Sequence, residues 1–197
     1  MKRILLVVFV LVAAACTTPG DTSGTDTANP GTTALSSTSE RSSATSSSAP
    51  GVTTTTSGRQ VAPDFALELG VGGTYTLSEG EKPVYLVFWA EWCPTCRREL
   101  PVIDELSIEY SDRVDFVAPA WKSTFVATEA RANELFPAGL VMWGLDENEH
   151  IFGLYGVPYQ PVTILIAGDG TVVESWPGLR DEAEIRSALD SLIALSS

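Results

Sequence analysis

An apolar run at residues 84–89 is followed closely by two cysteines spaced three residues apart, Cys93 and Cys96. The run reads Val-Tyr-Leu-Val-Phe-Trp, and its lack of alternation between polar and apolar residues indicates a central strand that is covered on both faces. Functional groups of open α/β sheets lie beyond the carboxyl ends of the strands. The run and the cysteines together therefore predict an α/β domain with a dithiol at the end of its central strand.

Strand-like and helix-like segments alternate through the rest of the domain. The segments predicted as strands are residues 63–69, 75–77, 84–89, 114–120, 140–145, 162–167 and 171–176. The segments predicted as helices are residues 94–110, 124–136, 147–155 and 181–195. The first two strands read as a β-hairpin, and the last two read as a second hairpin. This order predicts a central mixed sheet flanked by helices, with an N-terminal β-hairpin.

The N-terminus has the pattern of an export signal. Lys2 and Arg3 precede an apolar run at residues 4–15, which suits the core of a signal peptide and is too short for a spanning helix. The run ends at Cys16 after small residues, which resembles a bacterial lipoprotein signal and implies cleavage after residue 15 and lipidation of Cys16. Ala13 departs from that pattern, which usually has Leu there, and an ordinary secretory signal would be cut at the same bond. We expect lipidation, because a secreted chain would begin with a free thiol.

Residues 16–60 are predicted to form a disordered Ser/Thr-rich linker between the signal peptide, residues 1–15, and a folded domain, residues 61–197. More than half of residues 17–58 are Ser or Thr. Such a segment has too few large apolar side chains to offset the entropy cost of ordering it. We therefore expect a single domain tethered to the outer face of a membrane by its lipid anchor.

The chain carries a formal net charge of -13 at pH 7. Acidic and basic residues balance before residue 59, so the whole net charge falls on the predicted domain. An acidic surface disfavours nucleic acid and anionic lipid head groups. We therefore expect no nucleic-acid partner.

The spacing of Cys93 and Cys96 fits a dithiol that cycles between reduced and oxidised forms. At the start of a helix, the unpaired backbone N–H groups and the helix dipole stabilise the thiolate of Cys93. Pro94 suits the first helical turn and favours the turn that aims Cys93 outward. Cys96 is then the buried resolving thiol, which displaces a partner from a mixed disulfide.

Other uses of the two cysteines fit the sequence less well. A structural zinc site needs about four ligands, and the folded domain offers His150 as its single histidine. Covalent haem attachment needs His after the second cysteine, where this chain has Arg97. A structural disulfide and a membrane-tethered metal-binding domain remain alternatives. We expect no cofactor and no resident metal.

Residues 89–96, Trp-Ala-Glu-Trp-Cys-Pro-Thr-Cys, closely resemble the active site of thioredoxins. With Leu100 and Pro101, the segment is similar to the exported branch of TlpA, ResA and DsbE-like proteins. The resemblance covers about residues 61–197. It implies a thioredoxin-like fold and a protein-disulfide oxidoreductase.

Residues 155–163, Tyr-Gly-Val-Pro-Tyr-Gln-Pro-Val-Thr, resemble the second signature of the same family. By this match, Pro161 is a cis proline beside the cysteines, and the backbone of Gln160 is free to pair with a bound peptide. Apart from the family, a proline before a buried strand is reasonable at the start of the strand. A plain turn proline is the alternative, and Pro158 is the weaker cis candidate.

Thioredoxins carry an acidic residue in the central strand, where this chain has Val87. In the ResA-like branch an acid follows the second cysteine by three residues, which matches Glu99. Helical spacing puts Glu99 on the same face as Cys96, and we expect it to mediate proton transfer; a solvated helix carboxylate is the alternative. Trp92 is expected to form an apolar landing surface for partners, and Trp89 either shares this role or packs in the core.

Two further side chains of the motif have expected positions. Pro94 is expected to contribute to partner binding, and Arg97, with the arginine that follows it, is expected to lie in solvent.

The expected function is disulfide exchange with exported protein partners, with a membrane electron donor or acceptor. The direction is open between a reductase of the cytochrome c maturation type and an oxidant of secreted proteins. A peroxiredoxin-like peroxidase is an alternative, although its Pro and Thr positions correspond here to Leu86 and Ala90.

Overall fold

The computed structural model describes residues 60–196. The predicted signal peptide, the lipidation site Cys16 and all but the last residue of the predicted linker lie outside the described residues. None of the helices within residues 60–196 combines the length and the apolar character that a membrane span requires.

A five-stranded mixed sheet forms the centre of the domain, in the order β5-β4-β3-β6-β7. The strands are β3 (Val84–Phe88), β4 (Asp115–Ala120), β5 (Met142–Leu145), β6 (Val162–Ile166) and β7 (Val172–Pro177). β3, β4 and β5 run parallel, whereas β6 runs antiparallel to β3 and β7 runs antiparallel to β6. The mixed sheet with an antiparallel edge is therefore confirmed, and β3 is its middle strand.

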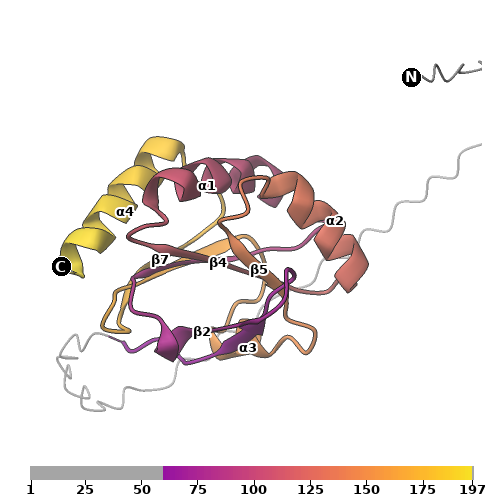
Figure 1. The fold of residues 1–197 in the computed structure, drawn as a ribbon, viewed down its shortest axis with the longest axis horizontal. Helices are drawn as coiled ribbons and strands as arrows, with labels where there is room; N and C mark the ends of the chain where they lie inside the picture. The colour runs from indigo at the N-terminus through magenta and orange to yellow at the C-terminus, as the bar shows by residue number, and fades with distance from the viewer. Residues whose placement is uncertain (1–59, 197) are drawn as a thin grey trace, which may run out of the picture. The chain divides into compact units, whose positions relative to one another are not determined.

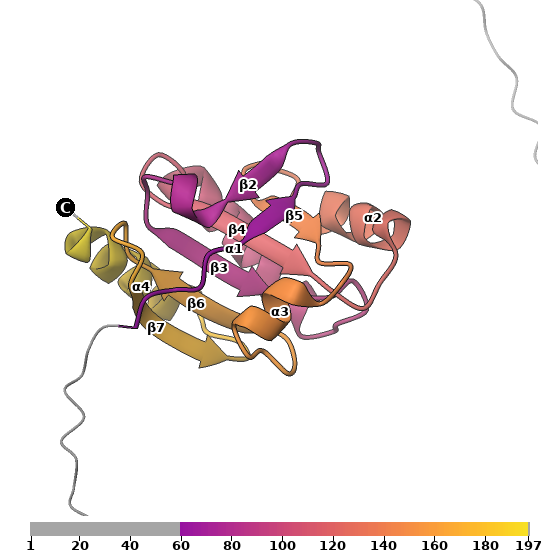
Figure 2. The same cartoon turned by 90° about the horizontal axis from the view of Figure 1, so that it is seen from below.

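Helices and a hairpin cover the two faces of the sheet. The elements outside the sheet are β1 (Ala66–Glu68), β2 (Thr74–Thr76), the 3-10 helix η1 (Leu77–Glu79), α1 (Cys96–Tyr110), α2 (Phe125–Leu135), α3 (His150–Leu154) and α4 (Glu182–Leu195). Figure 1 shows α1 and α4 on one face, with α2 beside α1. Figure 2, seen from below, shows the β1–β2 hairpin and α3 in front of the other face. The predicted N-terminal hairpin is confirmed.

Both faces of β3 are buried, as its uninterrupted apolar sequence predicted. All five strand residues are buried. On the face toward α3, Phe88 makes an edge contact with Phe152, with ring centroids 4.8 Å apart. Tyr85 points to the other face and packs against Trp176 with centroids 6.1 Å apart. Packing on both faces therefore fixes the position of β3, and with it the carboxyl end of the strand, from which the chain continues to Cys93.

The first long helix begins two residues later than predicted. Pro94 and Thr95 form a turn, and α1 begins at Cys96. The first bond of the helical pattern runs from the Arg97 N–H to the carbonyl of Cys93, at 3.3 Å. Cys93 thus lies just outside the helix and Cys96 opens it. The shift is the ordinary ambiguity at a helix terminus, where the first N–H groups have no partner in the helix.

Candidate active site

Cys93 and Cys96 form a disulfide at the junction of β3 and α1. Their Cα atoms are 5.3 Å apart. The backbone N–H of Cys96 donates to Cys93 Sγ at 3.1 Å, and the Cys93 N–H donates to the carbonyl of Ala90 at 3.1 Å. The turn and the first helical residue therefore hold both sulfurs at the carboxyl end of the central strand.

The two cysteines differ less in exposure than the sequence suggested. Cys96 is fully buried, as predicted, and Cys93 is only 3% exposed where an outward-pointing thiol was expected. In the oxidised form, Cys93 Sγ is bonded to Cys96 Sγ and therefore turns toward the start of α1. Access to Cys93 depends on the loops around it.

Glu99 is buried on the same side of α1 as Cys96. It is 1% exposed, and within residues 60–196 neither carboxylate oxygen has a hydrogen-bond partner. Burial raises the pKa of Glu99 from 4.5 to about 7, because a charged carboxylate loses its hydration there. The alternative of a solvated helix carboxylate is therefore wrong. Arg97 and Arg98, which precede Glu99, are exposed as predicted.

Val87, Tyr85 and Thr163 are buried residues of β3 and β6, and Tyr85 lies close enough to Glu99 to interact with its charge. Val87, which stands where thioredoxins have an acid, is fully buried and lies opposite Thr163 of β6. The hydroxyls of Tyr85 and Thr163 are 3.5 Å apart. Burial, and then the nearby charge of Glu99, raise the pKa of Tyr85. This phenol is therefore neutral at ordinary pH, and Glu99 is the group of this cluster that titrates near neutrality.

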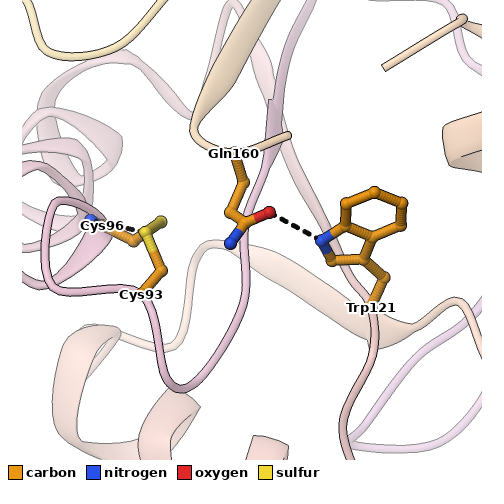
Figure 3. Close-up of a disulfide and its surroundings, with 4 residues drawn as sticks. All are labelled: Cys93, Cys96, Trp121 and Gln160. Atoms are coloured by element: carbon orange, nitrogen blue, oxygen red, sulfur yellow. Dashed lines mark hydrogen bonds between the residues drawn. A yellow bond between two sulfur atoms is a disulfide. The ribbon is translucent and has the colours of Figure 1, made fainter. Parts of the chain in front are cut away.

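The peptide bond between Gln160 and Pro161 is cis, as predicted, and it is the only cis bond within residues 60–196. Pro161 directly precedes β6, which pairs with β3. The side chain of Gln160 lies between the disulfide and Trp121 (Figure 3). Pro158, the weaker cis candidate, has a trans bond. The loop before β6 therefore lies beside the cysteine pair.

The two tryptophans of the motif have different surroundings. Trp89 is fully buried, and its indole N–H donates to the carbonyl of Ala118 at 3.0 Å. Trp89 is thus a core residue, and its proposed share in a landing surface is wrong. Trp92 is 47% exposed, and its indole N–H donates to the carbonyl of Lys122 at 3.1 Å. Trp92 is therefore the tryptophan that faces solvent beside Cys93.

Trp121 is a site residue that the sequence analysis missed. Its indole N–H donates to Gln160 Oε1 at 2.8 Å. The ring is stacked on Phe152, with centroids 3.9 Å apart and planes at 6°. One signal in the sequence could have found it. Trp121 directly follows β4, the parallel neighbour of β3, and so lies at the same sheet edge as the cysteines.

Potential metal ligands do not gather in the part of the chain that the structure describes. No group of three or more His, Cys, Asp or Glu side chains there could hold a metal ion. His150 begins α3, on the face of the sheet opposite α1. The chemistry that the described site supports is therefore that of the two sulfurs and the carboxyl group of Glu99.

The chain is similar to proteins of known family. A redoxin family model matches residues 56–192. The thiol-disulfide oxidoreductase ResA of Bacillus anthracis is 31% identical over 115 residues, which cover 56% of this chain and 64% of ResA. The chain thus spans slightly less than two thirds of the length of this relative.

Two solved structures have the same fold. The dsbF protein of Mycobacterium tuberculosis matches with a TM-score of 0.60 and 26% identity, over 65% of this chain and 94% of dsbF. The exposed lipoprotein thioredoxin Etrx1 of Streptococcus pneumoniae strain TIGR4 matches with a TM-score of 0.60 and 28% identity, over 66% of this chain and all of Etrx1. The expected thioredoxin-like fold is confirmed, and the chain belongs to the redoxin family, with ResA-like relatives.

Proposed function

We propose that this chain is an extracytoplasmic thiol-disulfide oxidoreductase that exchanges disulfides with exported protein partners. One observation carries the proposal. Cys93 and Cys96 are bonded to each other at the junction of the central strand and α1, with Cys96 fully buried. A pair of cysteines that can form this bond can take up and release two electrons in exchange with a partner disulfide.

The exchange proceeds in two steps when the chain reduces a partner. The Cys93 thiolate attacks one sulfur of the partner disulfide, so a mixed disulfide forms and the first partner thiolate leaves. Cys96, after losing its proton, attacks Cys93 Sγ, which releases the second partner thiolate and closes the Cys93–Cys96 disulfide. Two electrons pass to the partner. The reverse sequence oxidises a partner dithiol.

Glu99 mediates the proton transfer of Cys96 in this proposal. Cys96 is fully buried, so its proton needs an acceptor within the protein. Glu99 lies on the same side of α1, and its pKa of about 7 lets it take or give a proton near neutral pH. The catalytic residues are thus Cys93, Cys96 and Glu99, with Pro161 beside them.

Partners bind over the surface around Cys93. Trp92 and Pro94 are exposed next to Cys93, Gln160 is partly exposed, and Pro161, which follows it, is buried. The backbone of Gln160 pairs with an extended segment of the partner. This surface recognises polypeptide next to a cysteine.

The membrane location rests on the N-terminal sequence. Cleavage before Cys16 and lipidation of this cysteine tether the domain outside the cytoplasm, where a membrane protein donates or accepts the electrons. Similarity to the exposed lipoprotein Etrx1 supports this location. Mass spectrometry of the membrane fraction tests it, and an unmodified Cys16 peptide would contradict lipidation.

The reduction potential of the Cys93–Cys96 pair tests the function and decides its direction. The chain is equilibrated with glutathione or dithiothreitol buffers, and the thiols are trapped and counted. A value near or below about -250 mV assigns the reductase direction, and one near about -120 to -180 mV assigns the oxidant direction. A disulfide that none of these buffers reduces would be structural and would contradict the proposal.

A further inference from the structure

The side chain of Gln160 is held in one orientation by Trp121. The indole N–H has no acceptor capacity, so its 2.8 Å contact must be to the oxygen of the amide. The NH2 group of Gln160 is thereby turned away from Trp121. Figure 3 shows the amide nitrogen on the side of Cys93 and Cys96.

Trp121 is itself fixed on both faces. The ring of Phe152 stacks on the Trp121 ring with the two centroids 3.9 Å apart, and Lys122 Nζ lies over the Trp121 ring, 3.6 Å from its centroid. Lys122 also accepts the indole N–H of Trp92 through its backbone carbonyl. The segment after β4 therefore connects the cysteine turn with the loop before β6, and Trp121 is 5% exposed.

The amide NH2 of Gln160 has no hydrogen-bond partner among residues 60–196. The side chain is partly exposed, so an incoming molecule can reach it. The amide oxygen accepts the hydrogen bond from Trp121, so the group of this amide that faces the disulfide is the NH2 group, which is a donor. An oriented donor beside the nucleophilic cysteine selects an acceptor on the incoming molecule. The acceptor that every polypeptide partner brings next to its cysteine is a backbone carbonyl.

We propose that the side-chain amide of Gln160 donates a hydrogen bond to a backbone carbonyl of the partner beside its reacting cysteine, and that Trp121 is the positioning residue for this donor. The inference rests on the proposed function and adds to it a selection of polypeptide disulfides over small ones. Gln160 thus acts through its side chain as well as through the backbone.

Two probes separate this role from the sulfur chemistry. The first is the disulfide-linked dimer of acetyl-Ala-Cys-Ala-amide, which has carbonyls on both sides of the cysteine. The second is hydroxyethyl disulfide, which has no carbonyl. The second-order rate constant of the reduced full chain with each probe is measured by thiol trapping and mass spectrometry. The ratio of the two constants is the selectivity for peptide.

Gln160→Met removes the donor and keeps the length of the side chain, and it is expected to lower the selectivity about tenfold. Trp121→Phe keeps an aromatic ring on Phe152 but frees the amide to rotate, and it is expected to lower the selectivity about threefold to tenfold. In the Gln160→Met background, Trp121→Phe is expected to cause no further loss, because the two residues act through one contact.

A matched control is Trp143→Phe. Trp143 is 6% exposed, close to the exposure of Trp121, and its aromatic partner is Phe125 in α2. This variant is expected to keep the wild-type selectivity. The charged side chains of the cysteine motif and of the segment after β4 all remain in the three variants; they are Glu91, Arg97, Arg98, Glu99 and Lys122.

Three results would overturn the inference. They are an unchanged selectivity in Gln160→Met, an additional loss from Trp121→Phe in that background, and an equal loss in Trp143→Phe. If Trp121→Phe does not fold, Gln160→Met alone decides. A wild-type chain that reacts with neither probe would remove the proposed function and this inference with it, whereas one that reacts with both without selectivity would remove the inference alone.

Discussion

The two cysteines of the disulfide meet two different environments. Cys96 is fully buried at the start of α1, and Glu99, three residues further along the same helix, is buried as well. Around Cys93, the residues come from the loops after β4 and before β6, and Trp92 reaches solvent. In the proposed function, the inner side controls the proton of Cys96 and the outer side binds the partner.

This separation has a physical reason. Exclusion of water raises the pKa of a carboxyl group toward neutrality, as at Glu99. A partner can reach Cys93 only where side chains are accessible. One disulfide at the end of a strand meets both environments, because Cys96 opens α1 in the core while Cys93 lies in the turn between the exposed Trp92 and Pro94.

Replacing each cysteine in turn gives the largest expected effect. Cys96→Ser leaves the nucleophile and removes the resolving thiol, so a mixed disulfide with the peptide probe should accumulate and turnover should stop. Cys93→Ser should abolish both exchange and the mixed disulfide. Mass spectrometry of the alkylated products measures both. Accumulation in Cys93→Ser instead would reverse the two roles and break the comparison.

The two tryptophans that flank the motif should respond in opposite ways. Trp89→Ala should lower the free energy of unfolding by about 3 to 5 kcal/mol, because it empties a fully buried site. Trp92→Ala should change stability by less than about 1 kcal/mol and slow exchange with the peptide probe a few-fold. Urea denaturation and the exchange assay measure these effects. A stability loss of the same size in both variants would contradict the separation of core and partner surface.

Glu99→Gln tests the buried side of the disulfide through the pH dependence of the free energy of unfolding. The pKa of Glu99 in the folded chain, about 7, lies above its ordinary 4.5. The folded state therefore holds a proton that the unfolded state has lost, and wild-type stability falls by about 3 kcal/mol as pH rises through this window. Glu99→Gln removes this loss, so the variant should be more stable than wild type by about 3 kcal/mol at about pH 8 and similar at about pH 4.

Urea denaturation of the oxidised chains at the two pH values measures this difference. Glu105→Gln, on the exposed side of the same helix, is the matched control and should keep the wild-type pH dependence. The pH dependence of the reduction potential near neutrality should also change in Glu99→Gln. If it does not, Glu99 is not the proton mediator.

The smallest effect is expected from the arginines that precede Glu99. Arg97 and Arg98 are exposed, so water and salt screen their charges. The double variant Arg97→Gln with Arg98→Gln should shift the pKa of the Cys93 thiol by only a few tenths of a unit. Thiolate absorbance as a function of pH measures the shift. A shift of more than about one unit would mean that the outer side also controls the thiolate by charge.

Short sequence patterns were sufficient to predict the sheet and the disulfide. The apolar run of β3, the spacing of Cys93 and Cys96, and the proline before β6 are each read within a few residues, and the structure has all three where the sequence predicted them. The order of strands and helices follows from the same kind of signal. The positions of helix ends did not, because the terminal N–H groups can be satisfied in several ways.

Contacts between distant loops depended on the tertiary structure. Trp121 and Gln160 are 39 residues apart and meet only because β4 and β6 are the two neighbours of β3. Helical spacing could place Glu99 on the side of Cys96, but its burial without a hydrogen-bond partner follows from the packing of α1 on the sheet. Sequence alone thus determined which atoms can exchange electrons. The fold decided how completely water is excluded from Glu99 and which way the amide of Gln160 points, because both depend on neighbours that the chain brings together only when it is folded.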